Sequence, residues 1–191
     1  LGDIGFFTGG GTSKKGKSEY WDGDIPWISP KDMKDDYISE PELYVSELGI
    51  ENSSAKLIPR DSILIVARSG ILKRTLPVCI NSVDASVNQD IKVIIPYVKA
   101  QSRYIMLMLK GFEEYILRQL VKQGMTVQSL KYTEFENEPF PIPPLEEQHR
   151  IVRRIEELFA ICDRFKAQLQ QRQAVNERLV KGLVGEVLEG G

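Results

Sequence analysis

The chain has 191 residues, 42% of them hydrophobic and 27% charged, with a formal net charge of −2. This composition is typical of a globular protein and argues against a disordered or low-complexity chain. No run of about 18 apolar residues and no charged-then-apolar leader is present, so neither a membrane span nor a signal peptide is predicted. The two cysteines, Cys79 and Cys162, lie in different segments, which predicts reduced thiols and a cytoplasmic protein.

Charge is distributed unevenly along the chain. Between Asp61 and Lys131 there are ten Lys and Arg residues against five acids, whereas the residues from Leu145 onward are neutral overall, with eight of each sign. A basic face in the middle of the chain would suit binding to a phosphate backbone, although the net charge of −2 does not suggest a nucleic-acid partner. Solvated helix and strand faces would give the same composition, so both interpretations stay open.

The first elements are a predicted strand at Asp3 to Thr8 and a glycine-rich loop at Gly9 to Lys17. The loop matches no phosphate-binding glycine motif. We interpret it as a flexible basic loop that touches a nucleic-acid backbone, or as an ordinary solvent-exposed loop. Tyr20 follows the loop and is a candidate for stacking on bases, with core packing as the alternative. The candidate phosphate contacts in the loop are Lys14, Lys15 and Lys17.

Further strands are predicted at Ile25 to Ser29, Ser62 to Ala67 and Leu76 to Ile80, with a helical turn at Ser46 to Ile50. The second and third of these strands are almost continuously apolar, which is typical of strands buried on both faces. The loop between them carries three cations that are well placed to meet phosphates or guanine edges, unless it is simply a solvated basic loop. These cations are Arg68, Lys73 and Arg74.

The segment Ala85 to Asp90 is predicted to turn the chain into a strand at Ile91 to Ile95. Apolar residues at helical spacing then predict one amphipathic helix from Ser102 to Lys122, closed by Gly124 as the C-cap. Loop position and donor chemistry add four polar residues to the candidate nucleic-acid contacts. They are Asn88, Gln89, Gln123 and Thr126.

An extended proline segment followed by a long helix is predicted in the last quarter of the chain. Three prolines within Pro141 to Pro144 exclude a helix there. From Leu145 to Leu188, residues at alternating steps of three and four form a heptad seam on a helix of about 65 Å, which requires a partner helix. The seam comprises Ile151, Ile155, Leu158, Cys162, Phe165, Leu169, Arg172, Asn176, Leu179 and Leu183.

Catalytic chemistry is not predicted. The only histidine, His149, has no nucleophile and orienting group beside it, and no Cys/His spacing suggests a zinc site. Asp61 with Asp90 and Lys92 loosely resembles the carboxylate-plus-lysine arrangement of metal-dependent nucleases, but two acids fall into such loose spacing by chance. We therefore expect a protein without catalytic residues or metal ligands.

Several short motifs occur in the order seen in specificity subunits of type I restriction-modification enzymes, which the chain resembles over nearly its whole length. The most specific signal is the Gly-Asp-Ile-Pro-Trp block combined with the proline-to-Glu-Gln helix junction. The motifs are Gly10-Gly11-Thr12, Glu19-Tyr20-Trp21, Gly23 to Ile28, Lys56 to Pro59, Gly124-Met125-Thr126 and Pro141 to Gln148, with Arg150-Ile151-Val152 after them.

The resemblance implies an α+β protein: a mixed α/β target-recognition domain over residues 1–143, followed by a single long coiled-coil helix over residues 144–191. Family members normally carry two such units, whose helices pair antiparallel so that each domain reads half of a split site in double-stranded DNA. This chain has one unit, so an antiparallel homodimer through the long helix is expected.

The resemblance also implies a subunit that binds no cofactor. Modification and restriction subunits would dock on it and would themselves bind S-adenosylmethionine, ATP and Mg. The alternative is an assembly module that dimerises through its coiled coil and has little affinity of its own for DNA.

Overall fold

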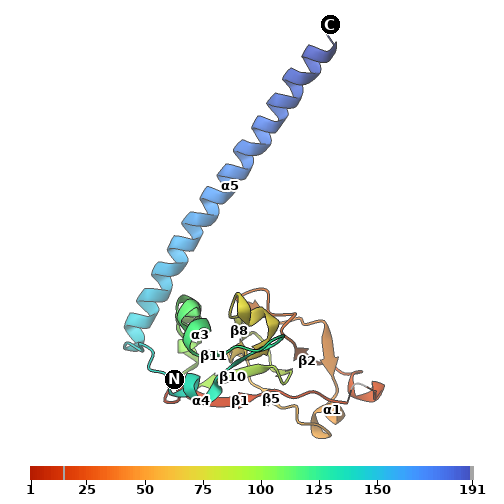
Figure 1. Ribbon diagram of the computed structural model, residues 1–191, viewed down its shortest axis with the longest axis vertical. Coiled ribbons are helices and arrows are strands. Elements are labelled where there is room, and N and C mark those ends of the chain that lie inside the picture. The colour runs from red at the N-terminus through yellow and green to blue at the C-terminus, as the bar shows by residue number, and fades with distance from the viewer. Residues whose placement is uncertain (15, 190–191) are drawn as a thin grey trace. The chain divides into compact units, whose positions relative to one another are not determined.

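The structure is a computed structural model that describes residues 1–14 and 16–189, with side chains described as far as Glu177 (Figure 1). The chain divides into two compact units, Leu1–Gln148 and His149–Gly191. The first contains every strand and the shorter helices, and the second is formed by the long C-terminal helix. Among the helices that the structure describes, none is long and apolar enough to cross a lipid bilayer.

The core of the first unit is a five-stranded sheet. Its strands in spatial order are β1 (Gly5–Gly9), β10 (Ile91–Pro96), β6 (Ile63–Val66), β8 (Val78–Asn81) and β3 (Tyr37–Ile38). Neighbours are antiparallel except β3, which runs parallel to β8. All four residues of β6 are fully buried, which confirms the prediction from its continuous apolar run.

A second sheet has four strands, with β2 and β9 parallel at its centre. Helix α1 (Glu47–Glu51) directly follows strand β4 (Leu43–Val45) of this sheet, and the Ser46 side chain caps the helix by accepting a hydrogen bond from the backbone N–H of Gly49 at 3.2 Å. The predicted helical turn is therefore confirmed. The strands in order are β4 (Leu43–Val45), β2 (Ile25–Ile28), β9 (Ala85–Val87) and β5 (Leu57–Ile58).

The region predicted as one helix from Ser102 to Lys122 is instead two helices and a strand. Helix α2 (Ser102–Gly111) packs on β8, and α3 (Glu113–Gln119) follows a break at Phe112. The chain then enters β11 (Val121–Lys122), because Val121 pairs with Leu130 across a small sheet. Tertiary pairing thus overrides local helical spacing, and Gly124 lies in a turn between strands instead of capping a helix.

That small sheet has three strands, and the remaining short helices complete the unit. Its strands in order are β11, β12 (Gln128–Leu130) and β7 (Arg68–Ser69). The short helices are the 3-10 turns η1 (Ser18–Tyr20), η2 (Gly70–Lys73) and η3 (Lys99–Gln101), and α4 (Tyr132–Asn137).

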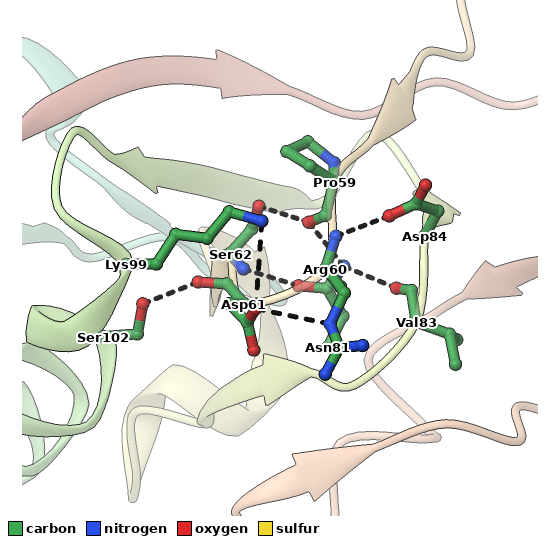
Figure 2. Close-up of polar contacts among 9 residues, drawn as sticks. All are labelled: Pro59, Arg60, Asp61, Ser62, Asn81, Val83, Asp84, Lys99 and Ser102. Atoms are coloured by element: carbon green, nitrogen blue, oxygen red, sulfur yellow. Dashed lines mark hydrogen bonds and ion pairs between the residues drawn. The ribbon is translucent and has the colours of Figure 1, made fainter.

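The turn that leads into β6 is held by a buried asparagine (Figure 2). The Asn81 amide donates to the carbonyl oxygens of Pro59 at 2.9 Å and Val83 at 2.8 Å, and its oxygen accepts from the Ser62 N–H at 2.9 Å. Asp61 in this turn has a φ of 68°, in the left-handed region, and its carbonyl oxygen accepts from Ser102 Oγ at 2.6 Å. The fold holds this less favourable backbone conformation with a dense set of hydrogen bonds.

Asp36 ties helix α2 to the edge of the main sheet. Its carboxylate accepts from Arg103 Nη1 and Lys110 Nζ, both at 2.5 Å. Burial by itself would raise the pKa of Asp36, but the hydrogen bonds from Lys110 and Arg103 outweigh it and hold the pKa below its usual value. The folded state therefore gains stability from this carboxylate when it is ionised.

We expect Asp36→Asn to lower the free energy of unfolding at neutral pH by about 1 kcal/mol, a figure reduced for solvent screening because the side chain is 35% exposed. The folded pKa is lowered, so this contribution is complete above the unfolded pKa of about 3.9 and is lost as the pH falls through the folded value. Urea unfolding from pH 7 to pH 2 should show the difference from wild type shrinking below about pH 4. The exposed neighbour Asp35 provides the control, and a similar loss in Asp35→Asn would contradict the prediction.

The C-terminal helix α5 (Leu145–Glu189) is one continuous element of 45 residues, as predicted. Pro144 accepts hydrogen bonds from the backbone N–H groups of Glu147 and Gln148, so the helix starts directly after the extended proline segment. Gln148 is buried, and its side chain donates to the Pro143 carbonyl oxygen at 2.8 Å. The first helical turn therefore belongs to the globular unit.

Candidate nucleic-acid interface

The predicted DNA contacts come from segments that emerge at one end of the five-stranded sheet. Gly9 at the end of β1 pairs with Lys92 near the start of β10, and Ile91 at that start pairs with Val66 at the end of β6. The loop after β1, the turn before β10 and the segment after β6 consequently share this end. Because adjacent antiparallel strands alternate in direction, segments far apart in sequence are brought together here.

Five of the predicted residues form one group, which we call the hairpin cluster. Strand β7 pairs with β12, matching Arg68 with Ser129, so the turn between β11 and β12 lies beside the segment from Gly70 to Arg74. Lys73 Nζ donates to the Met125 carbonyl oxygen at 3.3 Å across this junction. The hairpin cluster comprises Arg68, Lys73, Arg74, Gln123 and Thr126.

The hairpin cluster presents exposed donors on a well-held backbone. Arg68 and Arg74 are exposed, and within the described part of the chain no hydrogen bond or ion pair engages either guanidinium group. The turn beneath them is tight, since a Cβ at Gly124 would lie 2.2 Å from the Val127 carbonyl oxygen. Exposed guanidinium forks can donate to guanine edges and phosphates.

The glycine-rich loop differs from its prediction. A Cβ at Gly10 would lie 2.1 Å from the Asn88 carbonyl oxygen, and one at Gly11 would lie 2.3 Å from the Ser54 carbonyl carbon. Trp27 Nε1 donates to the Gly11 carbonyl oxygen at 3.1 Å, and Ser13 is buried. The interpretation of this part as flexible and solvent-exposed was therefore wrong, because these glycines allow close packing between backbones.

Among the described residues of that loop, the cations lie at its end. Lys14 is exposed, whereas Lys15 lies outside the described residues. Lys17 Nζ donates to the Tyr20 hydroxyl at 3.1 Å and lies 3.4 Å from the Glu19 carboxylate. The hydrogen bond with Tyr20 raises the pKa of Lys17, with a further contribution from Glu19, so its ammonium stays charged.

Tyr20 and Asn88 have structural roles. Tyr20 is only 5% exposed, so its ring is packed and unavailable for base stacking, in agreement with the alternative interpretation. Asn88 is also buried, and its side-chain oxygen accepts from the Asp90 N–H at 2.7 Å. Sequence alone did not distinguish these residues from exposed ones, because their burial depends on packing against distant segments.

The turn from Asn88 to Asp90 links the loop to the hairpin cluster. Gln89 is exposed, and its side-chain oxygen accepts from the Thr12 hydroxyl. The Asp90 carbonyl oxygen accepts from the backbone N–H of Ala67 at 2.7 Å and of Arg68 at 3.2 Å. Hydrogen bonds therefore connect Thr12 of the loop with Gln89, and Asp90 with the segment that carries Arg68.

The nuclease-like arrangement considered from the sequence is not assembled. Asp61 precedes β6 and Asp90 lies at the other end of that strand, so the two carboxylates do not converge. The Asp61 carboxylate instead lies 3.3 Å from Arg60 Nε and 3.9 Å from Lys99 Nζ (Figure 2). Among the residues that the structure describes, no three His, Cys, Asp or Glu side chains gather to hold a metal ion.

Burial raises the pKa of Cys79 to about 12, which keeps this thiol protonated.

Met125, between Gly124 and Thr126, was not among the predicted contacts, although its side chain is 99% exposed. The two short strands on either side of Met125 were not predicted from the sequence. Extending the helix prediction through Lys122 hid the hairpin and therefore its tip.

The heptad seam of α5 presents large apolar side chains to solvent. Leu158, Phe165 and Leu169 are 46%, 62% and 65% exposed, and Cys162, Arg172 and Asn176 are exposed too. Ile151 and Ile155 are half-buried. The side chains of Leu179 and Leu183 lie outside the described range. Pairing of this seam with another helix stays a prediction.

Comparison with known proteins identifies relatives that match most of this chain. The family model "Type I restriction modification DNA specificity domain" matches residues 1–173. The specificity subunit of the type I restriction enzyme EcoR124I/EcoR124II from Escherichia coli is 43% identical over 153 residues, covering 80% of this chain and 38% of that protein. The MjaIX specificity subunit from Methanocaldococcus jannaschii is 30% identical over 184 residues, covering 94% and 40%. The chain thus spans about two fifths of the length of these relatives.

Solved structures show the same fold. A chain from work described as "Structural basis underlying complex assembly and conformational transition of the type I R-M system" superposes with a TM-score of 0.75 at 18% identity, covering 97% of this chain and 44% of that one. The HsdS subunit from Thermoanaerobacter tengcongensis gives a TM-score of 0.60 at 17% identity, covering 83% and 36%. The predicted fold class, a mixed α/β domain followed by a long helix, is confirmed.

Proposed function

The chain belongs to the type I restriction-modification DNA specificity family, as its resemblance predicted, and from this premise we propose that it recognises a DNA sequence without catalysing a reaction itself. The observation that carries the proposal is the gathering of exposed donors at one end of the five-stranded sheet. Arg68 and Arg74 are exposed, and among the described residues no hydrogen bond or ion pair engages their guanidinium groups; Lys14 is an exposed cation in the loop after β1.

Different residue types have different roles in the proposed interface. Arginine pairs with the two acceptors of a guanine edge in the major groove, so Arg68 and Arg74 are the candidates for reading bases. Lysine meets phosphates of any sequence, so Lys14 and Lys17 hold the protein on the duplex. Gln89, Gln123 and Thr126 add uncharged donors between these positions.

We further propose that two copies pair antiparallel through the seam of α5. The exposure of Phe165 and Leu169 supports this, since a long helix with an apolar seam is stabilised by a partner helix. At about 1.5 Å per residue, the 45-residue helix spans close to two turns of B-DNA, which suits a spacer between two half-sites. Arg172 and Asn176 would fix the register of the pair.

In this proposal the catalytic chemistry belongs to partners. Modification subunits would dock on the helices and bind S-adenosylmethionine, and a restriction subunit would bind ATP and Mg. This chain would need no cofactor of its own and would act in the cytoplasm, where its DNA is found and its thiols stay reduced.

The second candidate function is an assembly module whose globular unit contributes little DNA affinity, and the exposed seam favours it as much as it favours the first. Dimerisation therefore does not separate the two candidates. Salt-dependent DNA binding does, because about 6 to 10 phosphate contacts cause a steep loss of affinity between 50 and 200 mM salt. An affinity that does not change with salt would leave only the assembly module.

The decisive experiment compares arginine and lysine variants on DNA. Duplexes selected by the wild-type chain from a randomised pool would be titrated with Arg68→Ala, Arg74→Ala, Lys14→Ala and Lys17→Ala. Loss of a base-reading arginine should cost about 1 to 3 kcal/mol and relax one base position, whereas loss of a lysine should weaken all sequences alike and lower the salt slope by about 1.

Arg60→Ala is the matched control, because Arg60 is an exposed arginine at the opposite end of β6. Its affinity and base preferences should equal those of the wild type. If both Arg68→Ala and Arg74→Ala behave like Arg60→Ala, the hairpin cluster does not read DNA.

A further inference from the structure

The hairpin between β11 and β12 ends in a fully exposed apolar side chain. Met125 is 99% exposed, the largest exposed fraction of any large apolar residue in the part of the chain that the structure describes. Single exposed apolar residues are common on protein surfaces, so exposure alone indicates nothing. The backbone and the neighbours of Met125 are what distinguish it.

Three interactions fix the backbone around Met125. Gln128 Nε2 donates to the Gly124 carbonyl oxygen at 2.9 Å, which closes the turn from within. Lys73 Nζ donates to the carbonyl oxygen of Met125 itself at 3.3 Å. Pairing of β12 with β7 fixes the base of the hairpin. The methionine is therefore presented at a defined position on the fold.

The neighbours of Met125 are polar donors. Gln123 and Thr126 flank it on the hairpin, and Arg68 and Arg74 lie on the adjoining segment, whose guanidinium groups are unengaged among the described residues. One thioether side chain thus projects from a basic surface. A partner that matches this surface combines negative charge and hydrogen-bond acceptors with one small apolar group.

The major groove of DNA offers that combination. It admits a two-stranded β-ribbon, and the one apolar group on its base edges is the C5-methyl of thymine. Resting on the proposed function, we propose that Met125 packs against a thymine methyl and so determines one position of the recognised sequence, next to the bases read by the arginines. A flexible, polarisable thioether suits a contact with a single methyl group.

Replacing thymine by uracil, which lacks only that methyl group, tests the contact. In the duplex that the wild-type chain selects from a randomised pool, each thymine would be changed singly to uracil, and affinities measured for wild type, Met125→Ala and Met125→Leu. One uracil should weaken wild-type binding about fourfold, from about 0.8 kcal/mol per buried methyl-sized group. Met125→Ala should bind the thymine duplex at least that much more weakly and be indifferent to that uracil, while Met125→Leu keeps most of the discrimination.

The control is Tyr97→Ala, since Tyr97 is 71% exposed at the far end of β10. It should keep both the affinity and the response to uracil. Because Met125 and Tyr97 are both solvent-exposed, neither substitution should unfold the chain, and circular dichroism of each variant would check this.

Several results would overturn the inference and leave the proposed function standing. These are a selected site without thymine, an unchanged uracil response in Met125→Ala, or an equal loss on thymine and uracil duplexes, which would place the side chain on the sugar-phosphate backbone. A variant that reads DNA normally but no longer binds a co-expressed modification subunit would instead make the tip a protein-docking residue. Wild-type protein without salt-dependent DNA binding would overturn the proposed function, and this inference with it.

Discussion

Replacing Phe165 and Leu169 together by Asp is expected to convert the chain from a dimer to a monomer in solution. Both side chains are more than 60% exposed along the α5 seam and would be covered by a partner helix. A dimer would bury four of them, worth about 6 to 12 kcal/mol at about 1.5 to 3 kcal/mol each. The dissociation constant should therefore rise by at least about 10⁴. Sedimentation equilibrium from nanomolar to high micromolar concentration would measure it.

The same helix provides a matched control. Ala167 and Gln171 have the same spacing but lie on the opposite face of the helix, so the double change of both to Asp adds the same charge away from the seam. This variant should stay dimeric. Monomeric wild-type protein, or equal dissociation of both double variants, would refute pairing through the seam, and the spacer role of α5 would then have to be abandoned.

Asn81→Leu should lower the free energy of unfolding of the globular unit by about 2 to 5 kcal/mol, because it leaves the buried Ser62 N–H without a partner and removes two further hydrogen bonds of the buried amide. Leucine has a similar volume, but the Ser62 N–H and the Val83 carbonyl oxygen lose their partner on Asn81 (Figure 2). The Pro59 carbonyl oxygen still accepts from Ser62 Oγ at 2.6 Å. The loss would be a large part of the usual stability of a domain.

Urea unfolding followed by tryptophan fluorescence would measure this change. The control is Asn52→Leu, the same substitution at an exposed asparagine whose side chain donates to the Leu48 carbonyl oxygen. It should cost less than about 1 kcal/mol. A midpoint for Asn81→Leu equal to that of Asn52→Leu would show that the turn before β6 does not depend on the buried amide.

Local sequence patterns were sufficient to predict the elements that depend mainly on local interactions. The prolines before Leu145 exclude a helix, and the periodic residues after it require one, so α5 was correctly predicted from its first turn. Strands β6 and β8 were predicted from continuous apolar runs, since a strand buried on both faces has no polar face. The order of the short motifs was enough to identify the family.

The interface required the tertiary structure. Spacing in the sequence placed Arg68 and Gln123 on separate loops, and their proximity depends on the pairing of β7 with β12, two short strands without a periodic signal of their own. Packing likewise decided that Tyr20 is buried and that Gly10 lies against another backbone, because burial depends on distant segments. Strand order finally determined which loops share one end of the sheet and placed Asp61 away from Asp90, since adjacent antiparallel strands present alternate ends to the same side.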